Sequence, residues 1–115
     1  MEYALLIYDD EKLWESADET LRRETYAQHE RYSKMLEDRG AIRGGAELAS
    51  TTSATTLRHR GDDVSVTDGP FAETTEQFGG FYLVEAADMA EAIELAKQLP
   101  GATVEVRPIV ANPEM

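Results

Sequence analysis

The sequence has no cysteine, so disulfide bonds and thiolate metal sites are excluded. It has only two histidines, and a metal site would therefore need carboxylates such as Asp68, Glu73 or Glu76. Nothing in the spacing of these residues demands a metal ion. We therefore expect neither a metal nor any other cofactor.

Long apolar runs and basic charge are also scarce. No apolar stretch approaches the roughly 20 residues of a membrane span, and no basic segment precedes the first apolar run, so no secretory signal is apparent. The 11 basic and 23 acidic residues give a formal net charge of −12, which repels nucleic acids and anionic lipid. We expect a cytoplasmic protein with no nucleic-acid or membrane partner.

Most catalytic signatures are missing as well. The chain has no glycine-rich dinucleotide loop, no Walker loop and no nucleophile elbow. His29-Glu30 begins like a zinc-protease signature, but the second histidine is absent. A catalytic role, if there is one, must therefore come from an arrangement that no short motif announces.

What is present fits a small globular domain. The chain has 115 residues, of which 42% are hydrophobic and 30% charged. We expect residues 1–110 to form one domain and residues 111–115 to be a loose C-terminal tail.

Hydrophobic patterning predicts strands at 3–8, 41–48, 79–85 and 103–107, and a hairpin from 55 to 67. A capping box at Ser16 and Glu19 predicts a helix that runs to about Arg39. Trp14 is expected in the loop before it. A second box, at Asp88 and Glu91, begins a helix that ends before Pro100.

This order, β-α-β-(hairpin)-β-α-β, predicts an α+β fold of the ferredoxin-like, split βαβ type with an antiparallel sheet. Two helices can cover only one face of the sheet, yet the runs at 3–8 and 81–84 are apolar on both faces. A second copy packed sheet to sheet would supply the missing cover, so we expect a homodimer.

Two residues are candidates for chemistry. His29 shares the inward helix face with Leu21, Thr25, Tyr32 and Leu36. It is either a satisfied core histidine or an acid–base residue, and the second role needs a partner that orients its ring. Asp68 begins the turn Asp68-Gly69-Pro70 at a strand end, and it is either a simple turn residue or that partner.

The segments 68–74 (Asp-Gly-Pro-Phe-Ala-Glu-Thr) and 76–85 resemble the YCII-related family, and more closely its branch named for the DGPF motif. Residues 3–8, 44–48 and 104–108 are also similar to that branch. The family pattern usually has lysine where this chain has Thr75, so an anion-binding role of that lysine does not carry over.

The resemblance implies a ferredoxin-like protomer in a dimeric α+β barrel, with His29 and Asp68 as the catalytic pair. Tyr32, Phe71 and Tyr82 are the aromatic residues expected to contact the substrate. The implied activity is proton transfer on a small organic molecule, as in a lyase, an isomerase or a dehydrohalogenase. The alternative is a non-catalytic dimeric binding or regulatory module, linked to an extracytoplasmic-function sigma factor.

Overall fold

The computed structural model describes residues 1–111. Four strands form one antiparallel sheet in the order β2-β5-β1-β6. Their bounds are Glu2–Asp10 for β1, Ile42–Glu47 for β2, Glu76–Glu85 for β5 and Thr103–Pro108 for β6. This strand order confirms the predicted α+β, ferredoxin-like architecture.

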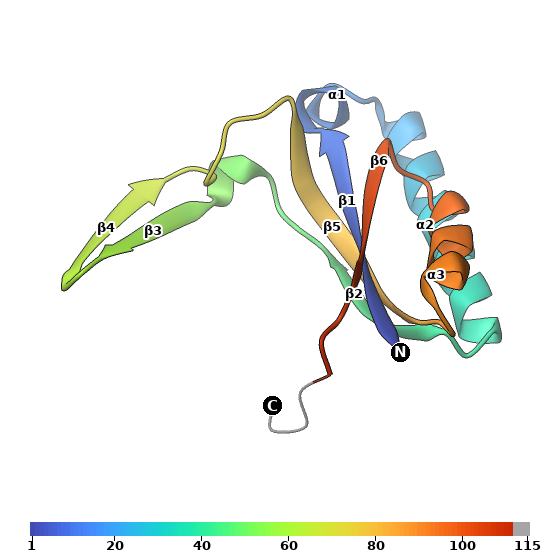
Figure 1. Cartoon of the computed structure of the whole chain (residues 1–115). Helices are drawn as coiled ribbons and strands as arrows, with labels where there is room; N and C mark the ends of the chain where they lie inside the picture. Colours follow the sequence, from blue (N-terminus) through green and yellow to red (C-terminus); the bar gives the residue numbers. More distant parts are fainter. Residues whose placement is uncertain (112–115) are drawn as a thin grey trace.

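Helices α2 (Glu19–Asp38) and α3 (Met89–Lys97) cover one face of the sheet (Figure 1). Strands β3 (Thr55–Arg60) and β4 (Asp63–Asp68) pair only with each other and form a separate hairpin. Figure 1 shows this hairpin extending from the sheet on the side opposite the helices. A short helix, α1 (Glu11–Glu15), follows β1, and a 3-10 turn, η1 (Thr51–Ser53), precedes the hairpin.

The start of the long helix differs from the prediction. Asp18, not Ser16, caps α2, because its carboxylate accepts a hydrogen bond from the Leu21 amide at 2.8 Å. Ser16 instead ends α1, a helix that the sequence analysis did not predict and that contains Trp14. Asp10 caps α1 by accepting from the Lys12 amide at 3.0 Å. Two aspartates therefore provide the caps, and the capping box at Ser16 was wrong.

The cap of α3 agrees with the prediction. Asp88 accepts from the Glu91 amide at 2.9 Å. The Glu91 carboxylate accepts in turn from the Ala87 amide at 3.2 Å, one residue before the position that the motif usually uses. Both donors at this helix start are therefore satisfied by side chains.

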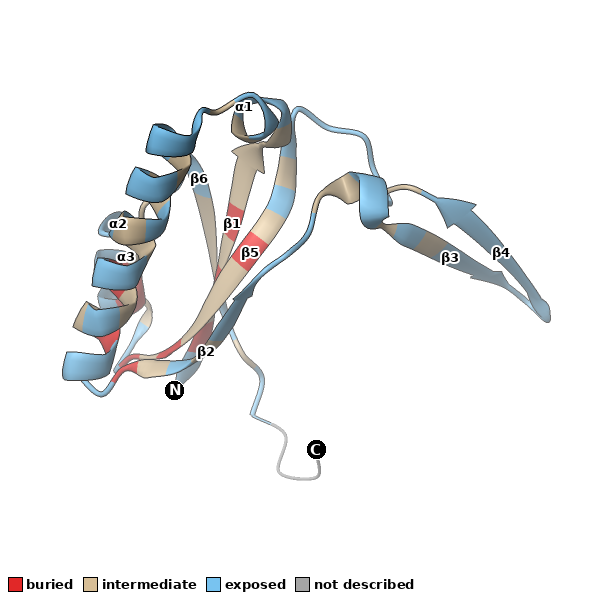
Figure 2. Ribbon diagram, turned by 180° about the vertical axis from the view of Figure 1, so that it is seen from behind, coloured by how far each residue is buried: buried red, intermediate tan, exposed pale blue. Residues whose placement is uncertain are grey.

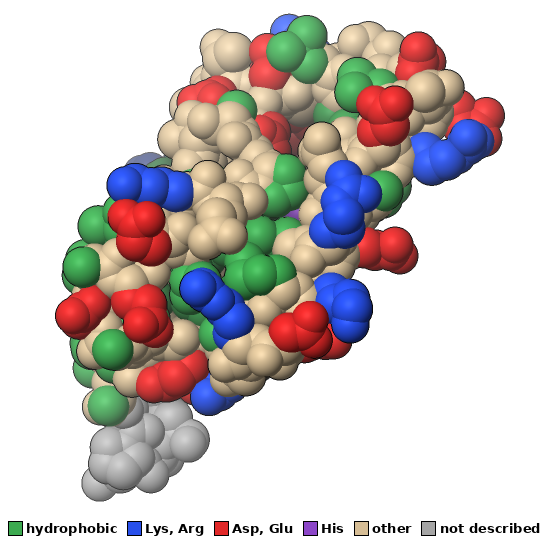
Figure 3. All heavy atoms as spheres, turned by 90° about the vertical axis from the view of Figure 1, so that its right-hand side faces the viewer, with side chains coloured by type: hydrophobic (Ala, Val, Ile, Leu, Met, Phe, Trp, Pro, Cys, Tyr) green, Lys and Arg blue, Asp and Glu red, His purple; other side chains and the backbone are tan. Residues whose placement is uncertain are grey.

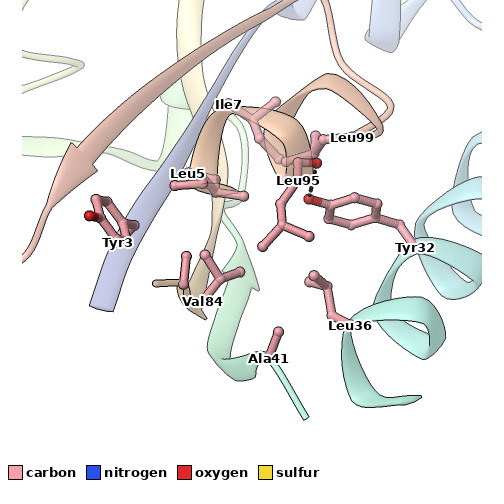
Figure 4. Packing of buried hydrophobic residues seen from close by; sticks show 11 residues of the cluster. Tyr3, Leu5, Ile7, Tyr32, Leu36, Ala41, Val84, Leu95 and Leu99 are labelled. Atoms are coloured by element: carbon pink, nitrogen blue, oxygen red, sulfur yellow. Dashed lines mark hydrogen bonds between the residues drawn. The ribbon is translucent and has the colours of Figure 1, made fainter. Parts of the chain in front are cut away.

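The hydrophobic core lies between the sheet and the two helices (Figure 4). Leu5, Val84, Leu36 and Leu95, from β1, β5, α2 and α3, are its largest fully buried side chains. Figure 2 shows the buried residues concentrated where the sheet meets the helices. Leu21, predicted to face inward, is 51% exposed, because the contribution of α2 to the core consists of Tyr32 and Leu36.

Among residues 1–111, no helix covers the opposite face of the sheet (Figures 1 and 2). We call it the open face. It is formed by the side chains that alternate with core residues along β1 and β5, namely Ala4, Leu6, Tyr8, Phe78, Phe81 and Leu83. The aromatic rings contact one another, with centroids 5.6 Å apart for Tyr8 and Phe78 and 6.4 Å apart for Phe78 and Phe81. Along β1 and β5 the open face is thus apolar, whereas on β6 the charged residues Glu105 and Arg107, the cross-strand partners of Leu6 and Ala4, lie on the same face.

The turn after β4 has the predicted geometry. Gly69 adopts φ = +113°, a conformation that side-chain-bearing residues rarely adopt. Its amide donates to the Ala54 carbonyl at 2.8 Å, which closes the base of the hairpin. The predicted tail at 111–115 lies outside the described residues except for Ala111, which is exposed.

Candidate active site around His29

His29 lies on α2, three residues before the buried Tyr32, and its side chain is half-buried between the helix and the sheet. Its Nδ1 atom is 2.8 Å from the hydroxyl oxygen of Tyr82 on β5. The two rings are nearly parallel, with centroids 6.0 Å apart and an interplanar angle of 10°. His29 is therefore held by a side chain of the sheet and not by a backbone carbonyl of the core.

Tyr82 is itself held by the core. Tyr32 packs edge-on against it, with centroids 5.1 Å apart at 72°. The Tyr32 hydroxyl donates to the Leu95 carbonyl at 2.7 Å, so that this buried phenol is satisfied within the core (Figure 4). Tyr32 thus positions Tyr82, and Tyr82 positions His29.

The surroundings of His29 favour its neutral form. Burial lowers the pKa of the imidazole below its ordinary value, because desolvation penalises the charged state. The carboxylates of Asp9 and Glu47 oppose this effect without reversing it. At neutral pH His29 is therefore uncharged, with one ring nitrogen able to accept a proton.

A second tyrosine extends the site along α2. The Tyr26 hydroxyl lies 3.1 Å from each carboxylate oxygen of Glu47 on β2. Trp14 packs edge-on against the Tyr26 ring, with centroids 5.5 Å apart, and the Arg22 guanidinium lies 5.4 Å from the Trp14 centroid. Burial and the hydrogen bond to Glu47 raise the pKa of Tyr26. Tyr26 and His29 border a shallow, open depression on the surface of α2, called the groove here, and all the residues that line it belong to this helix: Tyr26, His29, Glu30, Ser33, Lys34 and Glu37.

The other predicted site residues lie elsewhere in the protomer. Asp68 is exposed at the end of β4, where it pairs with Thr55 across the hairpin. No hydrogen bond joins Asp68 to His29 among residues 1–111, and the hairpin and α2 lie on opposite sides of the sheet (Figure 1). Phe71 is 74% exposed, with the Arg58 guanidinium 5.0 Å from its ring centroid. One chain therefore brings together His29, Tyr82 and Tyr32, but not Asp68 or Phe71.

The comparison with protein families matches this chain to the YCII-related domain over residues 1–112. The chain belongs to the YCII-related family. An uncharacterized protein of Rhizobium meliloti (strain 1021) is 40% identical over an alignment 118 residues long, which covers 95% of this chain and 92% of that protein. The assignment to the narrower DGPF branch stays a prediction.

Two participants in the site of this YCII-related protein were not predicted, Tyr26 and Glu47. They are 21 residues apart in the chain, and no motif connects them. The only available signal was that Tyr26 precedes His29 by three residues, which puts both on the same side of a helix. Their contact depends on how α2 packs against β2.

The described residues of this YCII-related chain were also compared with the requirements of a metal site, a membrane-spanning helix and a charged surface patch. In the described part of the chain, no three His, Asp or Glu side chains are grouped closely enough to hold a metal ion. None of its described helices has the length and apolar character needed to cross a membrane. Figure 3 shows acidic and basic side chains interspersed over the helix-covered side, with no large area of one charge.

Proposed function

We propose that this protein binds a small organic molecule in the groove beside His29 and transfers a proton there without a cofactor. The observation that carries the proposal is the hydrogen bond of 2.8 Å between His29 Nδ1 and Tyr82. It orients a half-buried imidazole whose pKa is lowered by burial. An oriented, neutral imidazole at the edge of a groove is suited to act as a general base.

The proposed chemistry follows from the tautomer. We assign His29 the tautomer in which Nδ1–H donates to the oxygen of Tyr82, which leaves the lone pair of Nε2 for the substrate. Nε2 takes a proton from a carbon or oxygen of the substrate and returns it to another atom, or to a leaving group. The hydrogen of the Tyr82 hydroxyl is then available to bond the substrate. Such a step is that of an isomerase or a lyase.

Asp68 remains a proposed contributor to the site. In the protomer the hydrogen-bond partner of His29 Nδ1 is Tyr82 and not Asp68. The side chain of Asp68 is exposed, and it makes no hydrogen bond to another of residues 1–111. The variant D68N therefore belongs beside H29Q in any test of activity. If D68N is as active as the wild type, Tyr82 alone orients His29.

We further propose that the functional unit is a homodimer. The support is the open face, where apolar side chains such as Leu6, Phe81 and Leu83 are only partly covered. Packing this face against a second copy removes it from water, and a twofold axis makes the contact self-complementary. Sedimentation at micromolar concentration is expected to give twice the mass of the chain, and a monomer would refute this assembly.

The test of proton transfer uses deuterium exchange. A panel of weak carbon acids that exchange slowly on their own, such as cyclic ketones, is incubated with the protein in D2O, and loss of the C–H signal is followed by proton NMR. We expect at least one compound to exchange at least tenfold faster with the wild-type protein than with H29Q. E24Q, an exposed position on the same helix, is the matched control and should behave as the wild type. Equal rates for wild type and H29Q across the panel would refute the base.

The second candidate is a non-catalytic ligand-binding or regulatory module. One observation favours it: the groove is shallow and open, so it does not exclude water as most catalytic pockets do. Saturable shifts of the His29 ring signals on addition of a compound, without any C–H exchange, would support this function. The link to a sigma factor stays a prediction from the resemblance.

A further inference from the structure

The hairpin of β3 and β4, residues 55–68, extends from the body of the protein and is called the arm here. It forms its own two-stranded sheet, separate from the four-stranded one. Figures 1 and 2 show it on the side of the open face, exposed along almost its whole length. An isolated two-stranded hairpin is at best marginally stable in water, so the arm needs a surface to pack on.

The arm has one mainly apolar side. Leu57 pairs with Val66, and Val64 lies two residues before Val66 on the same strand, so the three side chains share a face. His59, which pairs with Val64, lies on this face as well, with Thr55 and Asp68 at its base. Their exposed fractions are 53% for Leu57, 47% for Val64 and 65% for Val66. The neighbouring positions Arg58 and Ser65 pair with each other on the opposite, polar face. The strands thus alternate between apolar and polar residues, as strands do when one face is buried, yet the apolar face of the arm is exposed in the protomer.

The root of the arm is anchored to the body, which fixes its direction. The Glu11 carboxylate accepts from the Ser50 hydroxyl, from the Thr51 amide at 2.7 Å and from the Thr51 hydroxyl at 3.0 Å. The Thr56 hydroxyl on β3 donates to the Gly69 carbonyl at 2.8 Å, which joins the two ends of the arm to each other. The bonds of Glu11 hold the root of the arm on the body and oppose folding of the arm back onto the open face of its own chain.

The dimensions of the chain indicate how much surface is left to cover. Its radius of gyration is 16.3 Å, against about 13 Å for a compact domain of this length. Its accessible surface is 8220 Å², whereas a compact monomer of this mass exposes roughly 6,300 Å². The excess, roughly 1,900 Å², is within the area that one protomer buries in a large homodimer, roughly 1,000–2,500 Å².

We propose that the arm of each protomer packs its apolar face, formed by Leu57, Val64 and Val66, against a second copy of this chain. The inference rests on the homodimer of the proposed function and adds a second contact to it. Because the arm and the open face lie on the same side of the protomer, a twofold axis that pairs the open faces puts each arm alongside the partner (Figure 1). The arm thereby covers its own apolar side and enlarges the interface.

The test uses the absence of cysteine in the natural sequence. V66C places a thiol on the apolar face of the arm, and S65C places one on the adjacent polar face; both positions are exposed in the protomer. Alkylation by a small maleimide is timed at a protein concentration where sedimentation gives the dimer. We expect the thiol of V66C to react at least tenfold more slowly than that of S65C, and the difference to vanish in dilute, monomeric protein. L57C and R58C are a second such pair, should V66C fail to fold.

The outcomes separate the arm from the dimer. If the chain is monomeric at all concentrations, both the dimer and the docking of the arm are refuted. If it is dimeric but the two thiols react equally fast, the dimer stands and the arm contact is refuted. Protection of V66C that persists in the monomer would also refute the proposal, because the arm would then be covered by its own chain. Protection in the dimer alone supports it, and V66D should then weaken dimerisation at least tenfold, with S65D within twofold of the wild type.

Discussion

Replacing Tyr82 with phenylalanine tests whether its hydroxyl holds His29. The change removes one oxygen, the partner of His29 Nδ1 at 2.8 Å. It keeps the ring that packs edge-on against Tyr32 at 5.1 Å and lies parallel to His29 at 6.0 Å. The variant Y82F therefore isolates the hydrogen bond from the packing.

The expected loss of stability follows from the position of the bond. A net intramolecular hydrogen bond contributes about 0.5–1.5 kcal/mol, and an unpaired buried group costs about 1–3 kcal/mol. His29 is only half-buried, so water reaches part of the freed space and the loss stays near the lower values. We expect Y82F to lower the free energy of unfolding by about 1 kcal/mol, which is about 4 °C in Tm for a domain of this size.

The assay is urea unfolding at pH 8, at one fixed protomer concentration because dimerisation would add to stability. Y26F is the matched control, since it also removes a tyrosine hydroxyl. Tyr26 is 47% exposed, and its hydroxyl is bonded to the exposed carboxylate of Glu47. We expect Y26F to cost less than about 0.5 kcal/mol, because water replaces an exposed bond at little cost.

The imidazole of His29 provides a second readout. If Nδ1–H donates to Tyr82, that bond strengthens when the imidazole is charged, and its removal lowers the pKa of His29 further. Nitrogen NMR of the ring should also show the proton moving from Nδ1 to Nε2 in Y82F. A higher pKa in Y82F would mean that the phenol is the donor, and the proposed base at Nε2 would be refuted. An unfolding free energy equal to that of the wild type would refute the hydrogen bond itself.

Three further predictions concern pH, the core and the arm. Because burial lowers the pKa of His29, the unfolded chain binds more protons than the folded chain at mildly acidic pH. The contribution of His29 to stability is complete above about pH 6.5 and is lost as the pH falls through the lower pKa of the folded state. Denaturation curves should therefore show an unfolding free energy that decreases with falling pH, and this dependence should be weaker in H29Q. L36A removes a side chain with 0% exposure and should cost about 2–5 kcal/mol, whereas L21A, at a position 51% exposed, should cost less than about 1 kcal/mol; equal losses in thermal melts would contradict the placement of the core. E11A removes the acceptor of the Thr51 amide, so hydrogen exchange at that amide should accelerate at least tenfold, while exchange at core amides of β1 should not change.

Much of the fold was determined by the sequence through local patterns. The apolar runs at 3–8 and 79–85 predicted β1 and β5, which lie next to each other in the sheet, and the alternation in 103–107 predicted β6. The turn at Gly69 was predicted because only glycine adopts its backbone angle readily. The position of His29 on the inward side of α2 followed from its spacing to Thr25 and Leu36. All these features depend on residues within a few positions of one another, where periodicity and turn preferences act.

The start of α2 shows where local patterns were insufficient. Ser16 and Glu19 fit a capping box, yet Asp10 and Asp18 provide the caps. Each of these residues is a competent cap, and the choice depends on where β1 ends and how α1 packs. A motif read in isolation does not resolve such competition.

The site around His29 was decided by the tertiary structure. Tyr82 is 53 residues from His29 in the chain, and Glu47 is 21 residues from Tyr26. These pairs meet only because the strand order puts β5 beneath α2 and β2 at the adjoining edge of the sheet. The direction of the arm likewise depends on the bonds of Glu11 to Ser50 and Thr51, some 40 residues further along the chain. The sequence could name the inward-facing histidine, but strand register and helix packing, which no local pattern encodes, determined its partner.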